Sequence, residues 1–332
     1  MGLFIINKIE MASETLCAAF WQHTVLRPGN KIFACCRYKS PVQEFTGDLT
    51  SVLHSDKYNK LRQDSIDGIP NPNCQKCYYE ESLGKISQRK YLNSIYNTNN
   101  VDLKYLEIGF DNICNLTCDG CRGEFSSSWA NIEKPHVEGK INIQSVGEIT
   151  NVPSGIRRIE FLGGEPLMTS RHKNFLKLVK NPGDLEVVYN TNGTFLLDEE
   201  TISLLKQYKS VEFIISIDGY KELNEQVRSG SSWESILEFI NQIKRLEFSA
   251  LIHSVLHINN WFGIVELYNF VNDIRLPWRT QVLTYPTHLD IINLSWDQKM
   301  KFIALLENVS IPVHKYSTSS KEYIIKHLNI SK

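Results

Sequence analysis

The sequence lacks a strong excess of charge of either sign. Its 332 residues include 36 lysines and arginines against 37 aspartates and glutamates, which gives a formal net charge of −1. General nucleic-acid binders carry a clear basic surplus, so the composition argues against that class. The hydrophobic share of 42% and the charged share of 22% are ordinary for a globular protein with a sizeable core.

Long hydrophobic runs are also missing. No apolar run approaches the roughly 20 residues that a membrane-spanning helix needs. The opening MGLFII is apolar, but Lys8 and Glu10 interrupt it too early for a signal peptide. We therefore expect a cytoplasmic protein without a membrane partner. Cysteines stay reduced in that compartment, so they are better interpreted as metal ligands than as disulfides.

Cysteine is absent after residue 121, so all eight cysteines lie in the first part of the chain. Buried cysteines that serve as small hydrophobic residues would be scattered more evenly. Instead, Cys114, Cys118 and Cys121 fall within ICNLTCDGCRGE, residues 113–124, with C-x3-C-x2-C spacing. A closed structural metal site takes four ligands, whereas three thiolates on a four-iron cluster leave one iron open for a small chelating molecule.

From about residue 103, short β-rich runs alternate with segments of helical periodicity. The runs lie at 104–110, 157–162, 185–190, 211–217, 251–258 and 280–286. This alternation predicts parallel βα units, in an open sheet or a barrel. Residues 1–100 do not follow the rhythm, so we expect a separate small module there, the βα unit over 101–310, and a final helix in 311–332 capped by Ser319 or Ser320.

Distinctive residues follow the first four of these runs. The cysteine triplet follows the first run, GGEP (163–166) the second, TNGT (191–194) the third, and SIDG (216–219) ends the fourth. Each segment alone is an ordinary turn. Ligands of parallel βα folds bind at the carboxyl ends of the strands, so four such segments together predict a binding site.

The triplet after the first strand and GGEP after the second together resemble the radical S-adenosylmethionine (radical SAM) enzymes. The resemblance implies a partial six-stranded (βα)6 TIM-like barrel. It also implies reductive cleavage of SAM to a 5′-deoxyadenosyl radical, which abstracts a substrate hydrogen atom. Cys114, Cys118 and Cys121 would hold the catalytic 4Fe-4S cluster, and its open iron would bind the methionine moiety of SAM.

The resemblance assigns SAM contacts to further residues. The segment Gly163–Gly164–Glu165 would meet the methionine amino group, and glycine lets a backbone approach closely. Ser216 and Asp218 match the ribose site. Arg228 matches an arginine that pairs with the methionine carboxylate, and Asn192 is a further candidate. For Arg228 and Asn192 the alternatives, a solvated arginine and a turn asparagine, stay open.

One position departs from the family pattern. Many members carry an aromatic residue beside the adenine, just before the third cysteine, where this sequence has Gly120. Backbone contacts of Gly120 to adenine would survive, but side-chain stacking would not. We expect apolar cover from Leu256 or Leu283 instead.

The upstream cysteines resemble the auxiliary iron–sulfur module called SPASM or twitch, although that module usually follows the barrel. The resemblance implies a second 4Fe-4S cluster on Cys17, Cys35, Cys74 and Cys77, with Cys36 spare. The C-x2-C spacing also fits a four-cysteine zinc site, so zinc stays open. The charged residues nearby are expected at the surface: Glu80, Glu81, Arg89 and Lys90.

These features predict a radical SAM enzyme that abstracts a hydrogen atom, with a peptide or protein as the favoured substrate. The alternative is radical oxidation or epimerisation of a small sugar or aminocyclitol. A non-catalytic metal-binding protein is a third reading, because fold does not fix function. Such an enzyme would need a flavodoxin or a ferredoxin-type reductant as a partner.

Overall fold

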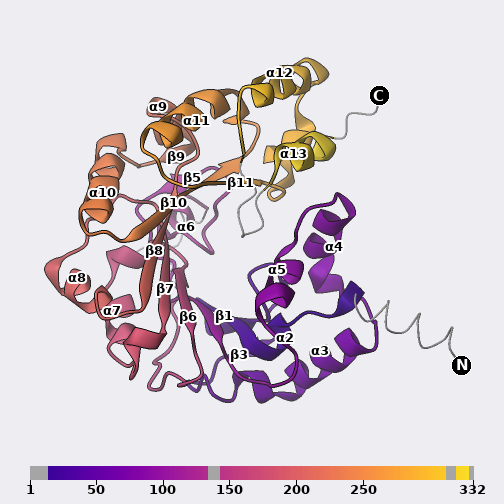
Figure 1. Ribbon diagram of the computed structural model, residues 1–332, viewed down its shortest axis with the longest axis vertical. Coiled ribbons are helices and arrows are strands. Elements are labelled where there is room, and N and C mark those ends of the chain that lie inside the picture. The colour runs from indigo at the N-terminus through magenta and orange to yellow at the C-terminus, as the bar shows by residue number, and fades with distance from the viewer. Residues whose placement is uncertain (1–13, 134–142, 312–318, 329–332) are drawn as a thin grey trace, which may run out of the picture.

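The computed structural model describes residues 14–133, 143–311 and 319–328, so MGLFII lies outside the described residues. Its centre is a nine-stranded sheet in the order β11-β10-β8-β7-β6-β4-β1-β2-β3 (Figure 1). The strands are β1 (His23–Arg27), β2 (Lys31–Phe33), β3 (Gln43–Glu44), β4 (Tyr105–Gly109), β6 (Arg158–Leu162), β7 (Glu186–Thr191), β8 (Ser210–Ser216), β10 (Ser249–Leu256) and β11 (Trp278–Val282). A second, two-stranded ladder pairs β5 (Thr117–Cys118) with β9 (Arg228–Ser229).

Six of these strands overlap the six β-rich runs of the sequence, although β11 begins two residues before its run and ends four residues before the run does. The strands β4, β6, β7, β8, β10 and β11 are neighbours in that order, and each pairs in parallel with the next. The α/β fold with a mostly parallel sheet is therefore confirmed. Figure 1 shows the sheet curving around a central space, with helices on its outer side, as in a partial barrel.

Helices separate successive sheet strands from β4 to β11, and others lie before and after this part of the chain. They are α2 (Ala19–Gln22), α3 (Asp56–Ile66), α4 (Gln75–Ser82), α5 (Gln88–Ile95), α6 (Ser127–Glu133), α7 (Arg171–Leu176), α8 (Glu199–Leu205), α9 (Glu222–Val227), α10 (Trp233–Arg245), α11 (Ile264–Asp273), α12 (Trp296–Glu307) and α13 (Lys321–His327). Short 3-10 helices are η1 (Val52–His54), η2 (Pro72–Cys74), η3 (Pro166–Met168), η4 (Pro182–Asp184), η5 (Trp261–Gly263), η6 (Thr287–Leu289) and η7 (Ile291–Asn293). None of the described helices is long and apolar enough to cross a membrane, and the cytoplasmic location stays a prediction.

Helix α10 shows how the sequence forms these elements. Its side chains at Ile236, Phe239, Ile240 and Ile243 recur at helical spacing and are all buried. The hydroxyl of Ser232 accepts a hydrogen bond from the Ser235 amide and caps the first turn. The buried stripe packs the helix onto the sheet, so the helix faces the core with one side only.

The first hundred residues extend the barrel sheet. Strand β1 pairs in parallel with β4, with His23 opposite Tyr105, while β2 and β3 add antiparallel strands at the edge. One hydrophobic core contains buried side chains from both parts, including Leu26 and Ile159. The boundary near residue 100 stays a prediction, but the strands on its two sides share a sheet and a core.

The side chains on the two faces of the barrel strands belong to two different buried clusters. Val187, Ile215 and Ile252 belong to the main core, under the outer helices. The alternate positions Val188, Ile214 and Leu251 form a separate small buried cluster. Successive side chains of a strand point to opposite faces, so this second cluster lies on the inner side of the curved sheet.

The predicted final helix is present as α13, and Ser320 rather than Ser319 is its N-cap. The other parts of the predicted 311–332 segment, residues 312–318 and 329–332, lie outside the described residues. Helix α13 contacts α4, because the Tyr79 hydroxyl lies 3.0 Å from Nδ1 of His327. His327 Nε2 in turn lies 2.7 Å from a carboxylate oxygen of Asp290. The end of the chain is thus tied to the cysteine-rich N-terminal part.

Candidate functional site

The cysteine triplet lies on the loop that follows β4, at the carboxyl end of the parallel strands. Within this loop Cys118 belongs to β5, which pairs with β9 in the register Cys118↔Arg228. The Asp119 amide also donates to the Val227 carbonyl at 2.7 Å. This short ladder brings the segment after β8 beside the triplet, so Arg228 lies next to a candidate cluster ligand.

A run of hydroxyl groups fixes the shape of this loop. The hydroxyls of Ser127 and Ser128 bond the Cys114 carbonyl at 3.3 and 2.7 Å. Indole Nε1 of Trp129 donates to the Cys118 carbonyl at 2.9 Å. The sequence did not assign a role to these residues. A possible signal was their position, since the segment SSSW begins five residues after the last cysteine.

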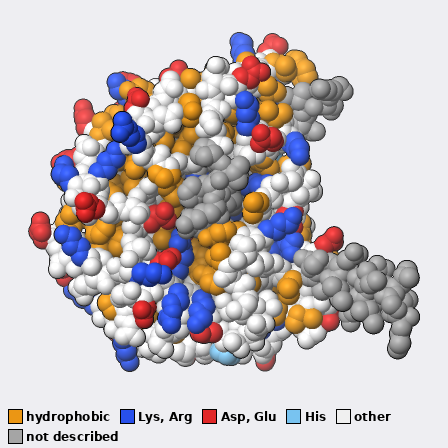
Figure 2. Space-filling view, in the orientation of Figure 1, with side chains coloured by type: hydrophobic (Ala, Val, Ile, Leu, Met, Phe, Trp, Pro, Cys, Tyr) orange, Lys and Arg blue, Asp and Glu red, His pale blue; other side chains and the backbone are white. Residues whose placement is uncertain are grey.

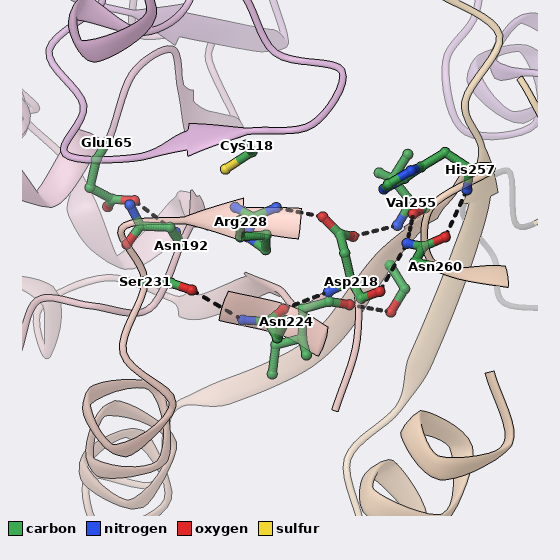
Figure 3. A network of polar contacts seen from close by, with 12 residues as sticks. Cys118, Glu165, Asn192, Asp218, Asn224, Arg228, Ser231, Val255, His257 and Asn260 are labelled. Atoms are coloured by element: carbon green, nitrogen blue, oxygen red, sulfur yellow. Dashed lines mark hydrogen bonds and ion pairs between the residues drawn. The ribbon is translucent and has the colours of Figure 1, made fainter. Parts of the chain in front are cut away.

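Arg228 is held in a buried polar network (Figure 3). Its Nη1 donates to Oδ2 of Asp218 at 2.7 Å, and both side chains are largely buried. Its Nε is shielded from solvent and has no hydrogen-bond partner among the described residues. Burial tends to lower the pKa of Arg228, but Cys118 and Asp218 raise it above its usual value. Arg228 is therefore not the solvated arginine of the alternative reading.

Asp218 is already fully engaged within the protein. Its Oδ1 accepts the Val255 amide at 2.6 Å, while Oδ2 takes Arg228. Asn224 and Asn260 hold its backbone at 2.9 Å on each side. A carboxylate that orients Arg228 is therefore the role with geometric support, and a ribose contact stays a prediction. The hydroxyl of Ser216 has no hydrogen bond to another described residue.

Gly163 and Gly164 lie where the GGEP segment touches the cysteine loop. A Cβ on Gly164 would stand 2.0 Å from the Ile113 carbonyl oxygen, and one on Gly163 would stand 2.8 Å from the Asp111 oxygen. Gly163 also has a φ of +118°, which favours glycine. The sequence argument attributed these glycines to the approach of a ligand. The structure shows that they first permit contact with the backbone that precedes Cys114.

The side chain of Glu165 points into the protein. It is 1% exposed and accepts hydrogen bonds from the Thr191 hydroxyl at 2.8 Å and the Asn192 amide at 2.7 Å. Burial raises its pKa to about 7, against the lowering effect of these bonds. Asn192 is also buried, and its Nδ2 donates to Asn115 in the cysteine loop at 2.9 Å. The Glu165 side chain thus joins the ends of β6 and β7, and Asn192 joins them to the cysteine loop. The Asn192 Oδ1 also accepts the Thr194 amide at 3.0 Å, as in the turn asparagine of the alternative reading.

Gly120 adopts a φ of +76°, in the region that glycine favours. A Cβ at this position would come within 2.8 Å of the Leu283 side chain. Leu283 thus stands where apolar cover for an adenine was expected. Leu256, the other candidate, is 1% exposed and belongs to the main core, so it is not available for that contact.

The donor set of the triplet fits an iron–sulfur cluster. Burial raises the pKa of Cys114 to about 11 and of Cys121 to about 12, while Arg228 counteracts the rise at Cys118. No three His, Cys, Asp or Glu side chains of the described residues converge closely enough to hold one metal ion. A four-iron cluster does not need such convergence, because each thiolate binds a different iron. Arg228 would offset part of the negative charge of bound thiolates.

The N-terminal cysteines form a second group. A small enclosed cavity is lined by all four predicted ligands: Cys17, Cys35, Cys74 and Cys77. Phe20 and Leu92 also line it. Burial raises the pKa of each thiol, and for Cys74 the value reaches about 12. Cys36 instead lines a different cavity, inside the barrel. The structure thus brings together the four cysteines chosen from the sequence, but a metal in this cavity stays a prediction.

The sequence argument expected the charged residues around this second group to lie at the surface, but Glu80 and Arg89 are buried. Glu80 is fully buried and pairs with Nζ of Lys85 at 2.9 Å. Arg89 is 5% exposed and forms an ion pair with Glu81. Only Lys90 is exposed as expected. Periodicity did not reveal this burial, because Glu80 pairs with Lys85 in the turn after α4, and Arg89 on α5 pairs with Glu81 on α4.

Comparison with known proteins gives similarity over part of the chain. Residues 109–271 match the model of the radical SAM superfamily. The GTP 3′,8-cyclase of Alkaliphilus metalliredigens is 26% identical over 177 residues, which cover 51% of this chain and 52% of that protein. The 7,8-dihydro-6-hydroxymethylpterin dimethyltransferase of Methanocaldococcus jannaschii is 28% identical over 153 residues, 44% of this chain and 28% of that protein. The chain thus spans about half the length, or less, of these relatives.

Among solved structures, Streptococcus suis SuiB bound to S-adenosylmethionine has a TM-score of 0.41 and 12% identity, over 80% of this chain and 52% of that chain. An anSMEcpe structure with bound AdoMet has a TM-score of 0.45 and 18% identity, over 61% of this chain and 57% of that chain. The family match covers the triplet, GGEP and Arg228, and it excludes the five upstream cysteines. Residues 109–271 of this chain are therefore similar to the radical SAM superfamily.

Proposed function

We propose that this protein is an enzyme that cleaves SAM reductively and uses the radical to remove a hydrogen atom from an organic substrate. The observation that carries the proposal is the placement of Arg228, through the β5–β9 ladder, beside the three-cysteine loop. Three thiolates would hold a 4Fe-4S cluster with an open iron, which supplies an electron for SAM cleavage when bound. The match of residues 109–271 to the superfamily supports both cofactors.

The residues of this chain would divide the binding of SAM among them. Arg228 has a buried Nε without a partner among the described residues, which suits the methionine carboxylate. The backbone of Gly163 and Gly164 lies beside the cysteine loop, where the methionine amino group is expected. The Ser216 hydroxyl has no hydrogen-bond partner in the described part of the chain and would bind the ribose, and Leu283 covers the space above Gly120 for the adenine.

The second part of the proposal is an auxiliary 4Fe-4S cluster on Cys17, Cys35, Cys74 and Cys77. It is supported by the convergence of these four side chains on one enclosed cavity that is separate from the triplet. Four thiolates would close the coordination of such a cluster, so its role would be electron transfer or placement of the substrate. A flavodoxin or a ferredoxin-type protein would supply the electrons for SAM cleavage.

Anaerobic reconstitution with metal counting tests both parts. We expect about eight irons per chain, formation of 5′-deoxyadenosine with a strong reductant, and a change in the spectrum of one reduced cluster when SAM is added. About four irons and one zinc would remove the auxiliary cluster from the proposal and leave the rest. Absence of 5′-deoxyadenosine from an iron-loaded, folded protein would refute the enzymatic function and favour a metal-binding protein.

The peptide or protein substrate expected from the sequence stays a prediction, and so does the alternative of a small sugar or aminocyclitol. GTP 3′,8-cyclases act on a nucleotide by their name, but the match covers only about half of those proteins. The interior of the barrel offers a more direct argument about the substrate.

A further inference from the structure

A cavity of about 290 Å³ lies inside the barrel, between the two cysteine groups. Its wall contains Leu162, which directly precedes Gly163, and Gln281, two residues before Leu283. The cavity therefore lies beneath the strand ends that carry the candidate SAM contacts. Arg37 lines both this cavity and the one formed by the four N-terminal cysteines. A molecule held here would stand between the two candidate iron sites.

One part of the cavity wall is positively charged. Arg37 lines the cavity, and its guanidinium makes no hydrogen bond or ion pair with another described residue. Glu80, which acts on Arg37 electrostatically, is already paired with Lys85 at 2.9 Å. Arg279 on β11 lines the same cavity. Burial lowers the pKa of the neighbouring His253, and Arg279 and Arg37 lower it further, as expected for a wall that favours an anion.

Another part of the wall carries carboxylates. Glu107 on β4 and Glu160 on β6 both line the cavity and stand opposite each other in the sheet register. Glu160 accepts Nδ2 of Asn190 at 2.6 Å and also the Tyr105 hydroxyl, while Oε1 of Glu107 lies 3.0 Å from His23 Nε2 and the Cys36 thiol is a further hydrogen-bond partner of Glu107. Arg158 lines this wall too, but it is shared between Glu160 and Glu186, at 3.6 Å each. This side of the cavity favours ammonium or hydroxyl groups.

We infer that this barrel cavity binds a small carboxylate that also carries hydroxyl or ammonium groups, with Arg37 holding the carboxylate and Glu107 and Glu160 facing the donor groups. The volume is at the lower end of the range for ligand pockets, about 300–1,000 Å³, and suits an amino acid or a monosaccharide acid. A guanidinium can bind a carboxylate through two parallel hydrogen bonds. The role of this ligand as substrate rests on the proposed function, whereas its binding does not.

A route into the cavity is also present. A surface groove of about 820 Å³ beside α5 shares Tyr91, Ile95 and Arg158 with the cavity wall. Arg157, Arg158 and Glu186 place this groove at the start of β6 and β7, away from the SAM contacts at the strand ends. Figure 2 shows hydrophobic side chains and lysine or arginine side chains next to each other around the place of α5. A ligand could thus enter while SAM occupies the opposite end.

Equilibrium binding of three related probes to the reconstituted protein with SAM tests the inference. D-glucosaminate carries carboxylate, ammonium and hydroxyl groups, D-gluconate lacks the ammonium, and D-gluconamide lacks the negative charge as well. We expect the affinity to fall in that order. Arg37→Gln should weaken binding of D-gluconate by about 10- to 100-fold, the loss of a charge-assisted pair, and leave D-gluconamide unaffected. Arg245→Gln, at an exposed position of α10, is the matched control and should change nothing.

Glu107→Gln is a second, independent variant in case Arg37→Gln does not fold. It should reduce the preference for D-glucosaminate over D-gluconate. Failure of all three probes to bind, equal binding of D-gluconamide, or unchanged affinities in both variants would overturn the inference. Preference for acetyl-Ala-Glu-Ala-amide over D-gluconate would assign the cavity to a peptide side chain instead, and would also overturn it.

The two proposals fail in distinguishable ways. A protein that forms 5′-deoxyadenosine but does not bind the probes keeps the proposed function and loses this ligand. A protein that binds the probes with the expected Arg37 dependence, but does not cleave SAM, keeps the cavity assignment and loses the radical chemistry.

Discussion

The two cysteine groups of this chain differ in the number of their cysteines and in their surroundings. The triplet lies at the ends of parallel strands, and the neighbouring charge is Arg228, whose guanidinium still has an unpartnered buried nitrogen among the described residues. The N-terminal group brings four thiols to one enclosed cavity. Three ligands with an adjacent anion-binding group suit a reactive site, while four ligands suit a closed one. The number of cysteines and the charge beside them therefore predict different kinds of chemistry for the two groups.

The largest expected effect comes from the triplet. Cys118→Ala leaves two thiolates, too few to hold a cluster with an open iron, so formation of 5′-deoxyadenosine should fall to background even with strong reductant. Chromatographic assay of the product measures it. Cys36→Ala is the matched control, because that thiol lines the barrel cavity rather than either cysteine group. A folded Cys118→Ala protein that works at the parent rate would remove the triplet from catalysis.

Replacing cysteines of the N-terminal group should have a different result from replacing Cys118. The double variant Cys74→Ala with Cys77→Ala should lose about four of about eight irons and retain cleavage of SAM without substrate, while substrate turnover is lost. Metal binding is coupled to folding, so circular dichroism must accompany the iron count. Complete loss of cleavage in a protein with native dichroism would mean that the two groups do not act as separate sites.

A smaller effect is expected from Gly164→Ala. The added Cβ would stand 2.0 Å from the Ile113 carbonyl oxygen, so the backbone before Cys114 has to move. Overpacking of this kind costs about 1–3 kcal/mol and should reduce SAM affinity and the iron held by the triplet. The iron of the N-terminal group should be unaffected, which iron counting after reconstitution of Gly164→Ala and the parent protein would show. Gly183→Ala, where a Cβ meets nothing within 4 Å, is the control.

The next effect concerns the stability of the folded protein at acidic pH, which depends on a buried histidine. His172 is 3% exposed, and burial lowers its pKa to about 4, with Lys173 adding to the effect. The unfolded chain takes up a proton near pH 6.5, so stability is lost as pH falls from about 6.5 toward 4, by on the order of 2–3 kcal/mol. Burial raises the pKa of Glu165 to about 7, which acts in the opposite direction over the same range, so the His172 contribution is measured as the difference between the parent protein and His172→Gln in urea unfolding at pH 7 and pH 4.5.

His172→Gln should flatten that pH dependence, since it removes the titrating ring, whereas His288→Gln, at an exposed position, should not. One core joins both parts of the chain, so far-UV dichroism and the fluorescence of Trp21 and Trp233 should report a single transition. Two separated transitions would restore the sequence-based expectation of an independent N-terminal module.

Much of the barrel could be predicted from the sequence because the information is local. Alternating β-rich and helical segments gave six strands that the structure contains, and the order of the cysteines gave the triplet its place after β4. The choice of Cys35 over Cys36, which came from the resemblance and not from spacing, also agrees with the cavity that the structure forms. These features depend on spacing along the chain, which the fold preserves.

The contacts around the site could not be predicted, because their partners are distant in the sequence. Asp218 matches the ribose position, yet its two oxygens bind Arg228 and the Val255 amide. Gly164 lies so close to the backbone of the cysteine loop that a Cβ would stand 2.0 Å from the Ile113 carbonyl oxygen. Glu80 is charged and fully buried, because the chain supplies Lys85 beside it. Hydrogen-bond geometry across strands decides these roles, and no residue pattern records it.

The sequence by itself determined the α/β architecture, the three-cysteine motif after β4 and the grouping of the remaining cysteines, because periodicity and spacing are properties of the chain. Only the tertiary structure decided that β1 joins the barrel sheet, that Arg228 lies beside Cys118, and that Arg37, Arg279, Glu107 and Glu160 line one cavity. Those side chains come from four separate segments. Their charges meet because the sheet curves and turns alternate residues inward, which is a consequence of the fold as a whole.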